Sequence, residues 1–245
     1  MTVTAEAPPQ GPAPRRGAAS PFRVAVRSLG EVMITLGVIL LLLVVYQIYW
    51  TNIEAGREQG QAKDNLRSSW VDGRAIQNGA FGIMYIQRLG RTWEKPLVEG
   101  VDLDQLSKGV GHFPKTAMPG QVGNFAVAAH RATHGEPFAY LDRIQPGDKV
   151  IVETKTNWFV YIVDTQKNPS VEHPGWKLVD PNYGEVVLPV PEQPGLKPTK
   201  KLITLVTCNP RWGSTTRMIV YGHLAKSYPK PGVKPTELDY MSKKA

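Results

Sequence analysis

Residues 201–224 read KLITLVTCNPRWGSTTRMIVYGHL, and they contain the clearest strand and turn signals of the chain. Its two ends are rich in β-branched and apolar residues, which favour strands, and the NPRWGS segment between them favours a turn. A hairpin in which Cys208 lies opposite Arg217 keeps the other side chains of that face in matched pairs. The next pairs on it are Val206 with Ile219 and Thr204 with Tyr221. The stretch therefore predicts two antiparallel strands with a thiol and a guanidinium side by side near their turn.

More strand-like runs precede this hairpin. Runs rich in β-branched and aromatic residues occupy 80–86, 124–130, 148–154, 157–165 and 185–190. Turn-forming Pro and Gly residues separate them, and helical patterns are confined to short pieces at 102–108 and 137–144. We therefore expect a mainly β domain that is closed or nearly closed into a barrel, because closure removes exposed sheet edges.

An uncharged stretch near the amino terminus predicts a membrane span. The 19 residues from Val32 to Trp50 carry no formal charge, which is about the length that a helix needs to cross the hydrocarbon layer. A buried helix of a soluble protein would show polar residues at helical spacing. A cleaved signal peptide would end in small residues, whereas this stretch ends in aromatic residues suited to the membrane interface. We expect one transmembrane helix at 29–50.

The composition of the remaining segments completes the domain plan. Residues 1–28 are rich in Ala, Pro and Gly and predict a disordered tail. Residues 51–75 mix both charge signs, which is typical of a solvated stalk, and the β domain occupies 76–228, followed by a loosely ordered basic tail at 229–245. Four arginines precede the apolar helix and three basic residues follow it closely. This bias favours a cytoplasmic amino terminus and a β domain outside the cell.

The formal charge of the chain is +8. A positive charge favours anionic surroundings such as lipid headgroups, wall polymers or nucleic acid. A domain outside the cell does not meet DNA or RNA, and the sequence has no basic motif interleaved with aromatic residues. We therefore expect the lipid bilayer and the cell wall, and no nucleic acid, as surroundings.

Cys208 is the only cysteine of the chain, so it is a candidate reactive thiol without a disulfide partner. It ends a strand, where reactive groups are commonly mounted, although a buried structural cysteine is the alternative. Arg217 would stabilise a neighbouring thiolate or oxyanion. His130 also ends an apolar strand and is suited to proton transfer near neutral pH, while His112 and His134 compete with it on composition alone.

A metal site is the other use of these side chains. His130, His134 and Cys208 could in principle bind a metal, but His-x-x-x-His without a Glu partner is a weak signal. The acidic residues show no spacing typical of calcium ligands. We expect neither a metal nor another cofactor.

Three sequence features together resemble the signature of the sortase family. They are TLVTC at 204–208, Arg217 nine residues after the cysteine, and AAH ending at His130. The segment GVGHFPKTAMPGQVGNFAVAAHRATHGEPF, residues 109–138, resembles class E sortases, which often carry Tyr where this chain has Phe113. The resemblance covers residues 76–228 and implies an eight-stranded β-barrel.

The resemblance also implies a cysteine transpeptidase. Cys208 would attack the carbonyl between Thr and Gly of a Leu-Ala-x-Thr-Gly sorting motif in secreted proteins, and an amine of a lipid-linked peptidoglycan precursor would resolve the thioester. His130 would act as acid and base, and Arg217 would stabilise the oxyanion. The candidates for shaping the peptide groove are Thr207, Leu205, His112 and Phe113.

Two other functions fit parts of the sequence. An L,D-transpeptidase-like cross-linking enzyme also uses an extracellular Cys and His on a β-rich fold, but its cysteine typically follows Ser-His-Gly, whereas Leu-Val-Thr precedes Cys208. A non-catalytic wall-binding module would make Cys208, His130 and Arg217 incidental. An inert thiol, with wall binding retained after Cys208→Ala, would favour that module.

Overall fold

The computed structural model describes residues 21–72, 79–166, 175–232 and 234–241. The chain divides into two compact units, with the boundary between Val45 and Tyr46. Each unit is described by itself below.

The first unit contains α1 (Pro21–Val45), none of whose residues is buried. Within the described residues, one helical segment near the amino terminus is long and apolar enough to span a membrane, in agreement with the sequence. The second unit begins with η1 (Tyr46–Trp50), a π-helical turn in which Tyr46 stacks on Trp50. Of the tail predicted at 1–28, residues 1–20 lie outside the described residues, whereas residues 21–28 belong to α1, so the expectation of disorder is wrong for them.

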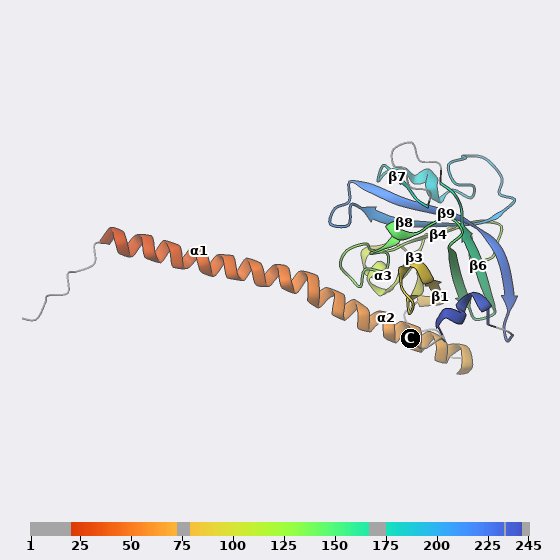
Figure 1. Ribbon diagram of the computed structural model, residues 1–245, viewed down its shortest axis with the longest axis horizontal. Helices are drawn as coiled ribbons and strands as arrows, with labels where there is room; N and C mark the ends of the chain where they lie inside the picture. The colour runs from red at the N-terminus through yellow and green to blue at the C-terminus, as the bar shows by residue number, and fades with distance from the viewer. Residues whose placement is uncertain (1–20, 73–78, 167–174, 233, 242–245) are drawn as a thin grey trace, which may run out of the picture. The chain divides into compact units, whose positions relative to one another are not determined.

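The second unit is built around a closed β-barrel (Figure 1). The strands are β1 (Ala80–Ile86), β2 (Glu94–Glu99), β3 (Val110–His112), β4 (Gly123–Ala128), β5 (Lys149–Thr154), β6 (Asn157–Val163), β7 (Lys177–Val179), β8 (Lys201–Asn209) and β9 (Thr216–Pro229). Their order is β6-β5-β1-β2-β3-β4-β8-β9, and pairing of β6 with β9 closes the circle. The pairs β2–β3 and β4–β8 are parallel. Because β7 adds only a short ninth strand alongside β9, the predicted eight-stranded barrel is confirmed.

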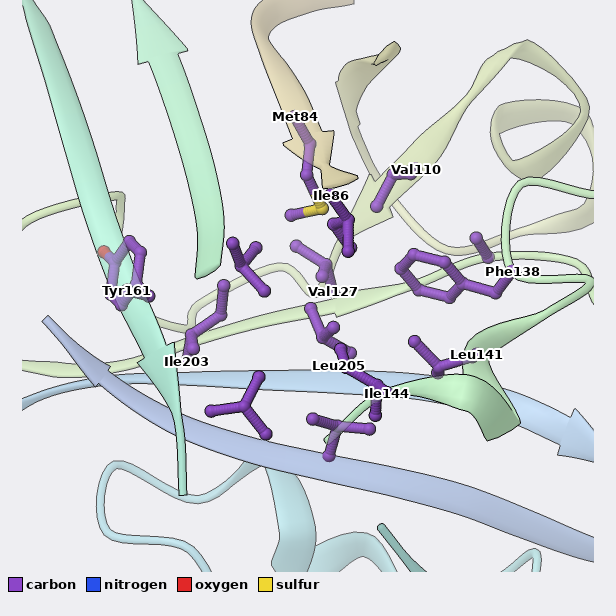
Figure 2. Packing of buried hydrophobic residues seen from close by; sticks show 14 of the residues in the cluster. Met84, Ile86, Val110, Val127, Phe138, Leu141, Ile144, Tyr161, Ile203 and Leu205 are labelled. Carbon is purple, nitrogen blue, oxygen red and sulfur yellow. The ribbon is translucent and has the colours of Figure 1, made fainter. Parts of the chain in front are cut away.

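Apolar side chains fill the interior of the barrel (Figure 2). Successive residues of a strand point to opposite faces, so Ile203 and Leu205 of β8 point inward, where they join Val127 of β4. Phe138 and Leu141, from the segment after β4, belong to the same buried cluster. This packing anchors the chain on the carboxyl-terminal side of His130.

A helix that follows η1 lies against the barrel along one narrow stripe. In α2 (Thr51–Asp72) the buried residues recur three or four positions apart and are Ala55, Gln59, Ala62, Leu66 and Ser69. Residues at this spacing share one face of a helix, and small side chains let that face approach closely. The helix contacts β1, β2 and α3 (Leu103–Lys108). The described part of 51–75 is therefore packed on the barrel, which corrects the expectation of a solvated stalk.

The carboxyl-terminal segment packs on the same side of the barrel. Leu238, in the 3-10 helix η6 (Thr236–Met241), is completely buried in a cluster with Leu66 of α2 and Ile83 of β1. Leu238 and its neighbours are therefore held by apolar packing, although the sequence predicts a loosely ordered tail. Residues 242–245 lie outside the described residues.

Leu66→Ala is expected to destabilise the protein by about 2–5 kcal/mol, because it removes a fully buried side chain and leaves a cavity. Denaturant titration of the full chain in detergent, followed by tryptophan fluorescence, measures the change, since Trp70 and Trp158 border the same cluster. Val71→Ala is the matched control because Val71 is exposed on the same helix. Equal stability of the two variants would contradict the packing of α2 on the barrel.

Some short elements differ from the sequence-based expectation. The sequence predicts a strand at 185–190, but the structure has the 3-10 helix η5 (Gly184–Val187) there, with Val186 buried. The helix expected at 137–144 is reduced to η4 (Leu141–Arg143). The strands β2, β3 and β7 are not predicted, because β2 contains a proline and the other two are only three residues long.

Candidate active site

Cys208 and Arg217 lie directly across the β8–β9 hairpin from each other. Their Cα atoms are partners in the antiparallel pairing, and the pairs Val206 with Ile219 and Thr204 with Tyr221 follow in the same register. Directly opposed residues of an antiparallel pair point to the same face. The register inferred from the sequence is thus confirmed, and it places the half-buried Cys208 and Arg217 on the same face of the hairpin.

His130 comes level with Cys208 through the parallel pairing of β4 and β8. The pairing aligns each residue of β4 with the residue 78 positions later, ending with Ala128 and Val206. A hydrogen bond between the Arg131 guanidinium and the side-chain oxygen of Asn209 continues the same alignment beyond β4. Continued in the same register, this alignment brings His130 level with Cys208, on the face that also carries Ala128 and Val206.

The imidazole of His130 sits in a partly enclosed setting. Among the described residues its Nε2 is buried without a hydrogen-bond partner. Its ring stacks on that of His134, with centroids 5.1 Å apart and planes inclined by 29°. Burial, and then the nearby His134, lower the pKa of His130 from its usual value. The ring is thus kept neutral at neutral pH, with one nitrogen available for proton transfer.

Arg217 is held by the turn of the hairpin. Its Nη1 donates hydrogen bonds to the carbonyl oxygens of Ser214, at 3.0 Å, and Thr216, at 3.3 Å. Within the described residues no carboxylate forms an ion pair with it. A guanidinium has five N–H donors, so a positive charge and further donors remain beside Cys208.

A small apolar cluster continues from Cys208 along the outer face of the barrel. Val206 and Ile219 are buried there under Val186 of η5, and Phe113 packs against them. The segment with β7 and η5 lies over the outer side of β8 and β9 in Figure 1. Of the residues predicted to shape a groove, Phe113 therefore lies on the face that carries Cys208.

Three other predicted groove residues lie on the inner face of the barrel. Leu205 is completely buried in the core, and Thr207 is 3% exposed. His112 is 2% exposed, with its Nδ1 2.7 Å from a Glu99 carboxylate oxygen. The structure does not bring these side chains to the Cys208 face. The Thr207 hydroxyl instead donates a hydrogen bond to the carbonyl of Ala129, the residue before His130.

The proposed metal set does not form a ligand cluster. In the part of the chain that the structure describes, no three His, Cys, Asp or Glu side chains converge as metal ligands. His134, weighed above as a ligand, stacks its ring face on His130.

Several residues that the sequence does not mark surround the site. Arg131 is 7% exposed and connects Asn209 to Asp142, while Arg211 pairs with Glu136. The cationic side chains of these pairs join the segments that follow His130 and Cys208. Arg131 and Asn209 are 78 residues apart in the chain, and Arg211 and Glu136 are 75 apart, so no local sequence pattern reveals these two contacts.

Comparison with known proteins assigns the β domain to a protein family. The sortase domain model matches residues 84–225. Sortase SrtE1 of Streptomyces coelicolor is 39% identical over 227 residues, which cover 88% of this chain and 61% of SrtE1, so the match spans less than two thirds of that relative.

Solved structures extend the comparison to the barrel. Sortase E from Streptomyces avermitilis is 41% identical, with a TM-score of 0.55, over 65% of this chain and 96% of that one. Sortase E1 from Streptomyces coelicolor, with a tripeptide in its active site, is 36% identical, with a TM-score of 0.56, over the same shares of the two chains. The β-barrel, the TLVTC strand and the extent of these matches show that this chain is a member of the sortase family and is similar to its class E.

Proposed function

We propose that this chain is a cysteine transpeptidase that cleaves a Leu-Ala-x-Thr-Gly sorting motif between Thr and Gly. It joins the new carboxyl end to an amine of a lipid-linked peptidoglycan precursor. The observation that carries the proposal is the pairing of Cys208 with Arg217 across the hairpin, with His130 level with Cys208 on the next strand.

Two acyl transfers make up the proposed reaction. The Cys208 sulfur bonds to the Thr carbonyl carbon, the C–N bond to Gly breaks, and His130 protonates the leaving amine. A thioester results. The incoming amine then attacks the same carbon, His130 takes its proton, and the C–S bond breaks. Splitting the exchange into two steps replaces one difficult barrier with two lower ones.

Each side chain has a physical reason for its role. The neutral imidazole of His130 can take the thiol proton, which creates a thiolate and an imidazolium side by side. The Arg217 charge, not neutralised by a carboxylate in the described residues, would stabilise the thiolate and later the oxyanion. The apolar cluster with Phe113 and Val186 would hold the Leu and Ala side chains of the motif. The peptide found in the active site of the Streptomyces coelicolor enzyme supports a peptide substrate.

The apolar amino-terminal helix supports a membrane location. A single-pass anchor fits its length and composition, and we place the amino terminus in the cytoplasm and the barrel outside the cell. A tether of this kind raises the local concentration of enzyme where secreted proteins and lipid-linked amines meet.

A peptide assay on the full chain in detergent micelles tests the function. A fluorogenic Leu-Ala-x-Thr-Gly peptide is incubated with and without a diaminopimelate-containing stem peptide, and the products are identified by mass spectrometry. We expect cleavage after Thr and a new product in which the amine replaces Gly. A peptide with the motif residues in scrambled order is the control. Absence of both products at high enzyme concentration would refute the proposal.

Arg217→Ala is expected to lower kcat about 100- to 1,000-fold, because it removes an oxyanion donor. Arg217→Lys keeps the charge but has fewer donors, so its loss should be smaller. Arg88→Ala serves as the control, since Arg88 is an exposed arginine that pairs with Asp148 on another part of the barrel. Steady-state kinetics measure the effects. An Arg217→Ala enzyme as active as Arg88→Ala would exclude Arg217 from the mechanism.

A further inference from the structure

The loop that follows His130 has a strained backbone conformation. Four consecutive residues have positive φ angles: Thr133 at 62°, His134 at 49°, Gly135 at 77° and Glu136 at 44°. Residues other than glycine adopt this region at a cost, and such conformations persist only where surrounding contacts enforce them. The loop at 131–137, called here the histidine loop, therefore needs external support.

That support comes from two amide side chains of α2. The Asn52 Oδ1 accepts a hydrogen bond from the Gly135 N–H at 3.0 Å, and its Nδ2 donates to Glu136 Oε1 at 2.7 Å. About two turns further along, the Gln59 Nε2 donates to the His134 carbonyl at 3.3 Å and to the Ser107 carbonyl at 3.1 Å. The helix thus holds both ends of the peptide group that joins His134 to Gly135.

The contact between Gln59 and the histidine loop is close and specific. Gln59 is 2% exposed, and its Oε1 accepts a hydrogen bond from the Lys95 ammonium at 2.8 Å, which fixes the orientation of the amide. A Cβ atom on Gly135 would lie 2.5 Å from the Gln59 Nε2. Glycine is therefore required at this position by both the close approach and the positive φ.

Glu136 connects this support to the Cys208 hairpin. One carboxylate oxygen accepts from Asn52 and the other from Arg211, in the turn after β8. Burial would raise the pKa of Glu136, but the hydrogen bonds from Arg211 and Asn52 outweigh it and hold the pKa below its usual value. The ionised carboxylate thus joins α2, the histidine loop and the strand connection that follows Cys208.

From these contacts we infer that Asn52 and Gln59 are positioning residues for His130. They hold the histidine loop in the one conformation that stacks His134 on the His130 ring. The helix that follows the apolar segment is therefore part of the active-site architecture as well as a connector. The inference rests on the proposed function for its kinetic consequence, but the positioning itself can be measured without catalysis.

Loss of this support should raise the pKa of His130. His134 of its own loop stacks on the His130 ring, and the titratable or charged groups level with His130 on the neighbouring strands are Cys208 of β8 and Arg217 of β9. Asn52→Ala changes none of them, but it releases the loop, so that His134 moves away and water reaches His130. Both changes remove causes that lower the pKa of His130, so that pKa should rise toward the ordinary value of about 6.5.

NMR titration of the full chain in detergent micelles, with ¹³C-labelled histidine, measures this pKa directly. The chain has five histidines, and loss of one signal in His130→Gln assigns the resonance. We expect the pKa of His130 to rise in Asn52→Ala and in Gln59→Ala. Val71→Ala is the control, because Val71 is exposed on the same helix and its substitution leaves the buried stripe intact; it should leave the pKa unchanged.

Kinetics provide the second readout. Misplacing His130 should lower kcat roughly ten- to a hundredfold, with little change in KM, and should shift the acid limb of the pH profile upward. The double variant Asn52→Asp with Glu136→Gln reverses the polarity of the side-chain hydrogen bond and retains the acceptor for the Gly135 N–H. It should recover activity and the low pKa relative to either single substitution.

The results of these experiments distinguish the positioning role from the proposed function. An unchanged His130 pKa in both the Asn52→Ala and Gln59→Ala variants, or an equal change in Val71→Ala, would overturn the positioning role. A failure of the double variant to recover either readout would also overturn it. A raised pKa in a chain that cleaves no sorting peptide would support the positioning role while contradicting the proposed function.

Discussion

Replacing Cys208 by alanine is expected to abolish both peptide cleavage and joining to an added amine. No other cysteine exists in the chain, so no second thiol can form the thioester. The half-buried sulfur lies on the face shared with Arg217 and, through the parallel strand, with His130. Without the sulfur, the oxyanion donor and the base have no acyl group to act on.

Mass spectrometry of the intact protein tests this prediction directly. Incubation with the sorting peptide, without an amine, should add the mass of the acyl fragment to the wild-type chain and nothing to Cys208→Ala. Peptide binding, measured by fluorescence anisotropy, should be retained, because the outer apolar cluster around Val206 is unchanged. Equal turnover by the two proteins would remove Cys208 from the mechanism. Retained binding to wall polymers without any turnover in the wild type would favour a binding module.

His130→Ala is expected to lower kcat/KM about 100- to 10,000-fold, the range typical of a lost general acid and base. The pH profile adds a sharper test. Because burial and His134 lower the pKa of His130, the acid limb of kcat/KM should lie below the ordinary histidine value of about 6.5. As pH falls through the folded-state pKa, His130 gains a proton and can no longer accept one from Cys208, so the rate falls.

Protonation of His130 should also affect stability in the same pH window. A histidine whose pKa is lower in the folded than in the unfolded state stabilises the fold above its unfolded pKa. That contribution is lost as pH falls through the folded pKa. His130→Gln, which cannot titrate, should therefore show a flatter loss of stability with acid than the wild type. An acid limb above 6.5 in the wild-type rate profile would contradict the enclosed neutral imidazole.

Local patterns predicted a large part of the barrel. The strand at 80–86 has the predicted bounds, and the hairpin register that pairs Cys208 with Arg217 follows from alternation on two neighbouring strands. These features depend on residues close in sequence, where side-chain period and turn chemistry suffice. The resemblance makes Leu205 and Thr207 candidates for the groove, whereas alternation from Cys208 places both on the inner face.

Local sequence patterns do not reveal that α2 packs on the barrel. Residues 51–72 contain many charged side chains, and their overall composition resembles a solvated segment. Only one face, with Gln59 and Leu66 in its stripe, contacts the barrel, and the surface that it covers comes from strands and loops elsewhere in the chain. An amide side chain such as that of Gln59 is buried only where its donors and acceptor form hydrogen bonds. The residues that form these bonds with Gln59 are distant from it in sequence.

Composition and neighbouring residues alone determined the apolar helix, the longer barrel strands and the register that pairs Cys208 with Arg217. The tertiary structure determines which histidine comes level with Cys208 in register and which contacts support the loop after it. His130 reaches that place only because β4 and β8, 78 residues apart in register, pair in parallel. Contacts over such separations are selected by the packing of the whole chain, because no local free-energy preference distinguishes His130 from His134 before the barrel closes.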